Sequence, residues 1–181
     1  MTHTGNHPEI TLAHPYDAPD IAPFMAHVFA HTYGSAIPQP TLTQYLNDTF
    51  HPTEVKNLLQ QPNRFSHLAR VNGHVVGVNQ MCYGVSPPQS QTVPPHNAIE
   101  IERFYVSPSH HSKGLAAQLL AAAIALARAK TIPLIWLCVW EHNQRAMAFY
   151  RKHGFLVTGH TSVWVNDIHF HDFVMSKNLE I

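Results

Sequence analysis

The sequence has few of the features that mark secreted, membrane-spanning or nucleic-acid-binding proteins. Its 181 residues include only two cysteines, Cys82 and Cys138, and both stand in apolar segments. We therefore expect buried free thiols in a reducing compartment. Charged residues make up 12% of the chain, with 11 basic and 11 acidic side chains and no long run of one sign. This balance argues against nucleic acid or a membrane surface as the main partner.

Long hydrophobic runs are also missing. The longest apolar helical segment, residues 115–129, contains Gln118 and Arg128 and is too short to span a bilayer. Residues 1–10 are polar and have no apolar centre of a signal peptide. We expect a cytoplasmic protein with a flexible terminus at residues 1–8 and a single domain over residues 9–181. The hydrophobic content of 45% is enough to form its core.

Histidine, in contrast, is abundant, with 16 residues. The pairs His169–His171 and His110–His111 are the candidates for metal chelation, but no third ligand is evident beside either pair. Because the histidines are scattered and the cysteines lie elsewhere, we expect no metal. A metal-binding, His-rich protein is kept as an alternative function.

The first half of the chain predicts one short strand, three helical segments and a hairpin. The hairpin comprises residues 64–71 and 74–83 around Asn72-Gly73, which is a strong turn signal. Apolar spacing predicts a helix within residues 17–31, broken by Pro19 and Pro23. Residues 84–97 hold four prolines and form a loop that is either a lid or slack chain. The remaining predicted segments are a strand at residues 10–13 and helices at residues 41–47 and 53–61, and we expect the helices to line a substrate cleft.

The second half predicts the order strand, turn, helix, strand, helix and then three closing strands. Residues 134–139 are apolar on both faces, which is typical of a central parallel strand. Asn143 and Gly154 suit the two ends of a helix. The predicted segments are strands at 98–106 and 134–139, helices at 114–130 and 143–154, and strands at 155–159, 162–165 and 168–176. This order predicts an α/β (α+β) fold.

The turn between residues 107 and 114 opens directly into the predicted helix. A helix N-terminus presents unpaired amide donors and a partial positive charge, and both attract phosphate. Gly114 allows close approach of the backbone, and Lys113 adds a cation. The turn is not a Walker loop, because Lys113 precedes Gly114 and the early glycine is missing. By itself it is either a phosphate site or simply the start of a helix.

A second segment, which follows the buried strand, extends the pattern. Together the two segments resemble the GNAT superfamily of N-acetyltransferases, and they lie within residues 100–155, about a third of the chain. The first resembles the family's acetyl-CoA pyrophosphate loop, although His111 stands where Arg or Gln is usual. The second resembles the helix that carries the catalytic tyrosine. Residues 140–155 with 171–175 look most like bacterial spermidine/spermine acetyltransferases. The segments read Val106-x-Pro108-x-x-His111-x-x-Gly114-x-Ala116 and Val139-x-x-x-Asn143-x-x-Ala146-x-x-Phe149-Tyr150-x-x-x-Gly154-Phe155.

The resemblance implies a fold and a set of cofactor contacts. The fold is a single GNAT-like domain whose mixed, twisted sheet splays between its two central parallel strands and carries helices on both faces. Acetyl-CoA is the implied co-substrate. Its thioester arm would lie between those strands, on the amides of Phe104, Tyr105 and Val106. Asn143 either contacts CoA or only caps its helix. The phosphates would bind the amides of the turn, contributed by His111, Ser112, Lys113, Gly114, Leu115 and Ala116.

Three side chains are candidates for the chemistry. Tyr150 is the expected acid for the departing thiolate, and its alternative role is a core aromatic beside Phe149. Glu100 and Glu102 alternate on a strand and so face the same side, where they would deprotonate or attract an amine. Their alternative is a solvated strand face near Arg103. We expect Cys138 to pack inertly and not to act as a nucleophile.

The sequence thus predicts an acetyl-CoA-dependent N-acetyltransferase that acts on a primary amine in a ternary complex. The expected partner is a small-molecule amine, including a polyamine, with no nucleic acid and no membrane. A homodimer is a further hypothesis. The alternatives are a protein N-terminal or lysine acetyltransferase, and a CoA-binding sensor or scaffold without catalysis.

Overall fold

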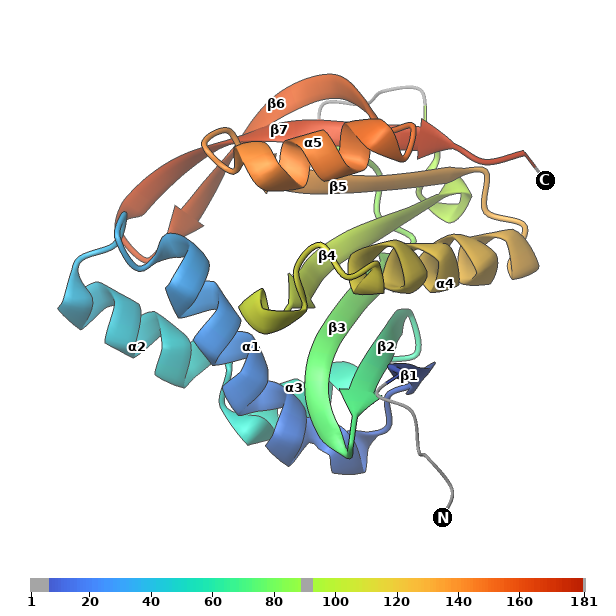
Figure 1. Cartoon of the computed structure of the whole chain (residues 1–181). Coiled ribbons are helices and arrows are strands. Elements are labelled where there is room, and N and C mark those ends of the chain that lie inside the picture. The colour runs from blue at the N-terminus through green and yellow to red at the C-terminus, as the bar shows by residue number, and fades with distance from the viewer. Residues whose placement is uncertain (1–6, 89–92, 181) are drawn as a thin grey trace, which may run out of the picture. The chain divides into compact units, whose positions relative to one another are not determined.

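The computed structural model describes residues 7–88 and 93–180 (Figure 1). The chain divides into two compact units. The first unit comprises Met1–Gln80 and Arg103–Ala122, and the second comprises Met81–Glu102 and Ala123–Ile181. Most of the terminus predicted to be flexible, residues 1–6, lies outside the described residues.

Seven strands are hydrogen-bonded in the order β1-β2-β3-β4-β5-β7-β6. β4 (Ala98–Val106) and β5 (Leu134–Trp140) pair in parallel. β7 (Ile168–Asn178) pairs antiparallel with β5 on one side and with β6 (Leu156–Val165) on the other. A mixed sheet accompanied by helices confirms the predicted α/β class.

The first unit begins with a short strand and three helices and continues into a hairpin. Its turn residues, Asn72 and Gly73, have φ values of 50° and 81°. Positive φ at both central residues defines the turn that matches the twist of two neighbouring strands, so the predicted hairpin is confirmed. The elements are β1 (Glu9–Leu12), η1 (Pro15–Asp17), α1 (Ala18–Tyr33), α2 (Gln39–Thr49), α3 (Pro52–Leu59), β2 (Arg64–Val71) and β3 (His74–Tyr83).

The prediction that prolines break the first helix was wrong, because α1 continues through both of them. Pro19 lies in the first turn, where a backbone N–H has no helical partner to lose. Pro23 removes one hydrogen bond inside the helix. Ile21 and Met25 on the same helix are both 0% exposed, and burial of these side chains offsets that loss.

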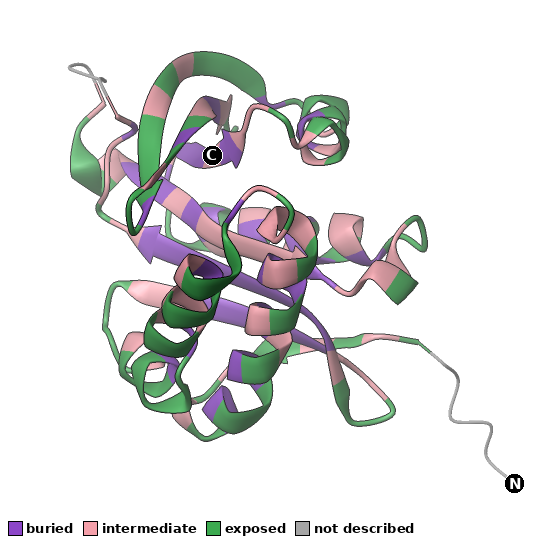
Figure 2. Cartoon of the chain, turned by 90° about the vertical axis from the view of Figure 1, so that its left-hand side faces the viewer, coloured by how far each residue is buried: buried purple, intermediate pink, exposed green. Residues whose placement is uncertain are grey.

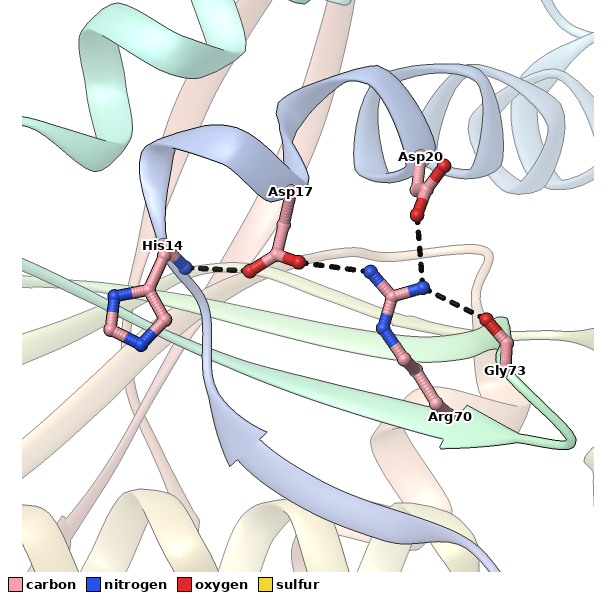
Figure 3. Close-up of polar contacts among 5 residues, drawn as sticks. All are labelled: His14, Asp17, Asp20, Arg70 and Gly73. Carbon is pink, nitrogen blue, oxygen red and sulfur yellow. Dashed lines mark hydrogen bonds and ion pairs between the residues drawn. The ribbon is translucent and has the colours of Figure 1, made fainter.

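Arg70 on β2 joins the start of α1 to the β2–β3 turn (Figure 3). Its guanidinium donates to Asp17 Oδ1, to Asp20 Oδ2 and to the carbonyl oxygen of Gly73, each at 2.9 Å. The second oxygen of Asp17 accepts the backbone N–H of His14 at 2.8 Å. The side chain of Asp17 is only 12% exposed, so its charge depends on these two donors.

Helices cover both faces of the last part of β4 within the first unit. Phe104 and Val106 pack with Leu115 and Leu119 of α4 (Leu115–Ala129). The alternate residue, Tyr105, turns the other way and contacts the ring of Phe50, which follows α2. The predicted arrangement of helices on both sides therefore holds for this part of the sheet.

The second unit contains β5, α5 (Gln144–Lys152) and the β6–β7 hairpin, together with the first part of β4. Two separate strands were predicted at residues 155–159 and 162–165, but β6 is continuous. Gly159, His160 and Thr161 keep pairing with β7, and the register shifts between Val157 and Gly159. Gly159, at which the first of these strands was predicted to end, thus lies at a β-bulge within one strand. Figure 2 shows central strands that are mostly buried, whereas most of β6 and the outer sides of the helices are exposed.

The loop at residues 84–97 is fixed at its described ends. The side chains of Val85 and Val93 pack against the buried cluster that contains Trp136. Ser86 Oγ donates to the carbonyl oxygen of Val93 at 2.8 Å, and Trp136 Nε1 donates to that of Val85 at 2.8 Å. Residues 89–92 lie outside the described residues, so a lid function stays a prediction. No helix among the described residues has the length and apolarity needed to cross a membrane.

Candidate functional site

The turn before α4 has the backbone shape of an anion site. Ser112 and Gly114 have φ values of 60° and 82°, and Lys113 lies between them. Alternation of left-handed and right-handed residues turns successive N–H groups toward one side, which forms a concavity for anions. A Cβ on Gly114 would meet no atom within 4 Å, so the turn needs glycine there for its φ and not for space.

The amides of this turn are available to a ligand. Within the described part of the chain, the N–H groups of residues 112–117 donate no backbone hydrogen bond beyond those inside helices and strands. The next N–H along the chain, that of Gln118, donates to the carbonyl oxygen of Gly114. These amides sit at the positive end of the 15-residue helix α4. The side chain of Lys113 beside them is exposed. The donor set therefore fits a diphosphate.

His111 contributes to the turn in a different way. Its Nε2 donates to the carbonyl oxygen of Val106 at 3.0 Å, so the ring is bound to the end of β4. The amides of His110 and His111 close a short 3₁₀ turn, η3 (Pro108–His110), onto Ser107 and Pro108. The histidine that replaces the usual Arg or Gln thus fixes the turn to the strand, and the amides that follow remain available.

The parallel pairing of β4 and β5 is short. The register joins Ala98–Ile101 to Leu134–Leu137, whereas β4 runs on to Val106 and β5 to Trp140. This register lies within the second unit, and the predicted splay between the two strands beyond it stays a prediction. Phe104, Tyr105 and Val106, the predicted thioester-arm residues, all lie in the part of β4 beyond this register.

Tyr150 occupies the last turns of α5 in the second unit. Its side chain is 5% exposed and packs against the rings of Phe149 and Phe155. Burial raises the pKa of the phenol above its ordinary value of 10. The hydroxyl therefore remains protonated throughout the neutral range, which is the form that an acid requires. Tyr150 is also a core aromatic beside Phe149, which is the alternative role predicted for it.

Asn143 caps α5, as predicted. Its Oδ1 accepts the backbone N–H of Ala146 at 3.1 Å, which satisfies one donor of the first helical turn. At the other end Gly154 has a φ of 83°, and Lys177 Nζ donates to the carbonyl oxygen of His153 at 2.7 Å. A contact of Asn143 with CoA stays a prediction.

Glu100 and Glu102 lie on β4 in the second unit and alternate with the buried residues Ile99 and Ile101. Both glutamates are half-buried, and Glu102 Oε2 is inaccessible to solvent. The negative charge of Glu100 reaches Cys138 on β5, so the two side chains are close. The predicted pair is thus not a fully solvated strand face.

Cys138 and Asp172 extend this acidic region. Burial, followed by the charges of Glu100 and Asp172, raises the pKa of the Cys138 thiol to about 12. A thiol with this pKa is a poor nucleophile, which agrees with the inert role predicted for it. Burial, together with Glu141, raises the pKa of Asp172 to about 6. Asp172 was not among the site residues predicted from the sequence, although its position in an alternating apolar strand was a usable signal.

The structure thus gathers the predicted residues in two groups. Glu100, Glu102, Asn143 and Tyr150 belong to the second unit, and the other predicted site residues belong to the first. The rings of His169 and His171 lie 4.5 Å apart, but the described residues contain no cluster of three side chains that would hold a metal.

Comparison with known proteins identifies a family for this arrangement. The model of the Acetyltransferase (GNAT) family matches residues 29–155. An uncharacterized N-acetyltransferase of Lactobacillus delbrueckii subsp. lactis is 29% identical over 163 residues, which is 90% of this chain and 92% of the relative. One from Mycobacterium bovis is 26% identical and covers 90% and 98%.

Solved structures share the fold at lower identity. The PaiA N-acetyltransferase from Thermoplasma acidophilum, determined in complex with coenzyme A, superposes with a TM-score of 0.78 at 19% identity and covers 96% of this chain and 99% of its own. A GNAT-family acetyltransferase from Streptococcus pneumoniae has a TM-score of 0.67 at 22% identity and covers 96% and 100%. The family match spans well over half of the chain, and it includes the amide-rich turn and the helix of Tyr150. The chain therefore belongs to the acetyltransferase (GNAT) family and is an N-acetyltransferase, as its two sequence motifs predicted.

Proposed function

We propose that this N-acetyltransferase uses acetyl-CoA and transfers the acetyl group directly to a small primary amine. The observation that carries the proposal is the turn at residues 112–117, whose amides are available at the start of α4. The solved relative from Thermoplasma acidophilum binds coenzyme A on the same fold, which supports the choice of nucleotide. In this chain the amides of Ser112 to Ala116 and the cation of Lys113 would hold the diphosphate.

The last part of β4 holds the reacting arm in this proposal. Amides of Phe104, Tyr105 and Val106 would pair with the pantetheine chain and donate to the thioester oxygen as negative charge develops there. The nitrogen of the neutral amine attacks the thioester carbonyl, a C–N bond forms and the C–S bond breaks. Tyr150 gives its proton to the departing thiolate. The proton lost by the amine passes to Glu100 or Glu102, directly or through water.

The resemblance indicates a class of acceptor but no single molecule. Because the resemblance includes bacterial polyamine acetyltransferases, a polyamine belongs in the panel of candidate amines. Protein N-termini and lysine side chains are the enzymatic alternative, and a CoA-binding sensor is the non-catalytic one.

A turnover assay with a matched pair of tyrosine variants tests the proposal. CoA thiol release is measured from acetyl-CoA with a panel of amines, and acetyl-CoA binding is measured by calorimetry. Tyr150→Phe should lose about 10²–10⁴-fold in kcat and keep acetyl-CoA binding. Tyr16, whose side chain is 76% exposed, supplies the control: Tyr16→Phe removes the same hydroxyl and should leave kcat unchanged.

Two results would contradict this assignment. Full turnover in Tyr150→Phe would remove the tyrosine from proton transfer. Acetyl-CoA binding without turnover of any small amine, peptide N-terminus or lysine would favour the sensor.

A further inference from the structure

Five aromatic side chains form a cluster in the first unit, and none of these side chains has been given a role so far. Phe29 of α1 lies at its centre, with ring centroids at 4.6 Å from Tyr33, 4.9 Å from Tyr45 and 5.6 Å from Phe50. Tyr105 of β4 meets Phe50 edge to face at 6.3 Å. Phe29 and Phe50 are buried, whereas the three tyrosines are half-buried around them. The cluster therefore has an apolar floor and a rim with polar tips.

The tyrosine rings surround the two buried phenylalanines. Tyr45 and Tyr105 both meet the Phe50 ring edge to face, with ring centroids 6.1 Å and 6.3 Å away. Burial raises the pKa of the Tyr105 phenol, and the charge of Arg103 acts in the opposite direction.

Arg103 adds a positive charge to the same rim. Its Cζ lies over the Phe50 ring, 5.8 Å from the centroid, and its Nη1 donates to Gln80 Oε1 at 2.9 Å. A guanidinium has five N–H donors. Among the described residues this is the only hydrogen bond that Arg103 donates, and no carboxylate there forms an ion pair with it. Arg70, in contrast, binds two carboxylates.

The position of the cluster connects it to the proposed reaction. Phe104 and Val106 turn toward α4, whereas Arg103 and Tyr105 turn toward Phe50. The backbone amides proposed to hold the thioester arm belong to residues 104–106, so the rim begins at the same stretch of β4. A molecule seated on the rim would lie beside that stretch.

We propose that this rim, formed by Tyr33, Tyr45, Tyr105 and Arg103 over Phe50, binds the acceptor amine, and that the acceptor carries an aromatic ring and a carboxylate. The ring would stack on the tyrosines, and the carboxylate would accept the remaining N–H donors of Arg103. An aromatic amino acid has this chemistry. A polyamine does not, because it brings only positive charge toward Arg103. The inference rests on the proposed function for the transfer itself, whereas acceptor binding is measurable without turnover.

The experiment measures binding and turnover with four probes: phenylalanine, phenethylamine, alanine and spermidine. Phenethylamine lacks the carboxylate, alanine lacks the ring, and spermidine lacks both. Binding is followed by ligand-observed NMR with CoA present, and kcat/KM by thiol release. Phenylalanine should exceed phenethylamine by about 10–100-fold, which is typical for a hydrogen bond to a charged group. Arg103→Met should reduce this ratio to near one.

Two further variants separate binding from folding. Arg128, which is exposed on α4, provides the matched control, since Arg128→Met removes the same charge and should keep the wild-type ratio. Arg103→Lys retains the charge and should restore part of the preference. Acetyl-CoA binding in every variant reports whether the first unit is folded.

Each outcome decides one of the two proposals. Phenylalanine binding that depends on Arg103, without acetylation of any probe, would support the acceptor site and reject the proposed transfer. Turnover that is highest with spermidine would overturn the acceptor inference and leave the transfer intact. Equal losses for phenylalanine and phenethylamine in Arg103→Met would also overturn it, because the arginine would then act on the fold and not on the carboxylate.

Discussion

Replacing Arg70 with methionine should destabilise the first unit by about 2.5–4.5 kcal/mol. The Asp17 carboxylate, 12% exposed, would lose a charge-assisted hydrogen bond of about 1.5–3 kcal/mol. The Gly73 carbonyl would lose a further bond of about 1 kcal/mol. The side chain of Asp20 is 60% exposed, so that pair adds about 0.5 kcal/mol or less. Methionine retains most of the apolar contact, so the loss reports the polar network of Figure 3.

The assay is urea unfolding followed by far-UV circular dichroism. Fluorescence is unsuitable, because Trp136, Trp140 and Trp164 all belong to the second unit. Asp20→Asn is the control and should cost about 0.5 kcal/mol or less, and 1 M salt should remove even that. An Arg70→Met variant no less stable than Asp20→Asn would show that the contacts of Asp17 and Gly73 contribute nothing, which would refute the reasoning.

Three other predictions address the site and its surroundings. Gly114→Ala should weaken acetyl-CoA binding in calorimetry and lower the free energy of unfolding by about 1 kcal/mol, because alanine is strained at a φ of +82°. Gly73→Ala is the control, since Gly73 has a φ of +81° and equal space for a Cβ; it should lower the free energy of unfolding by the same amount and leave binding unchanged. With a pKa of about 12, only a fraction of ~10⁻⁵–10⁻⁴ of Cys138 is thiolate at pH 7.5. Iodoacetamide should therefore alkylate Cys138 about 10³-fold more slowly than a free thiol of ordinary pKa 9.0. Cys138→Ala should keep full turnover. The fold favours the protonated form of Asp172, whose pKa rises from 3.8 to about 6, so ionisation destabilises the protein increasingly from pH 4 to above 6. Asp172→Asn should therefore raise the unfolding free energy by roughly 1 kcal/mol at pH 7.5, after allowance for solvent screening, and leave it unchanged at pH 4 in pH-dependent denaturation.

Local signals predicted the elements that depend on neighbouring residues. Asn72-Gly73 predicted the hairpin because the turn requires positive φ at both positions, and the structure has it. Asn143 and Gly154 marked the ends of α5 because helix ends leave backbone groups that only certain residues satisfy. Pro23 misled the prediction because the burial that offsets its missing hydrogen bond comes from packing outside the helix.

Sequence by itself determined the family, the mixed α/β class and the amide-rich turn, since each depends on residue types at short, fixed spacing. Only tertiary structure decided that His111 binds the end of β4, that Asp172 and Glu100 approach Cys138, and that Arg103 lies over Phe50. Such contacts join residues from different helices and strands. Their burial and charge arise from packing between those elements, which one-dimensional spacing does not encode.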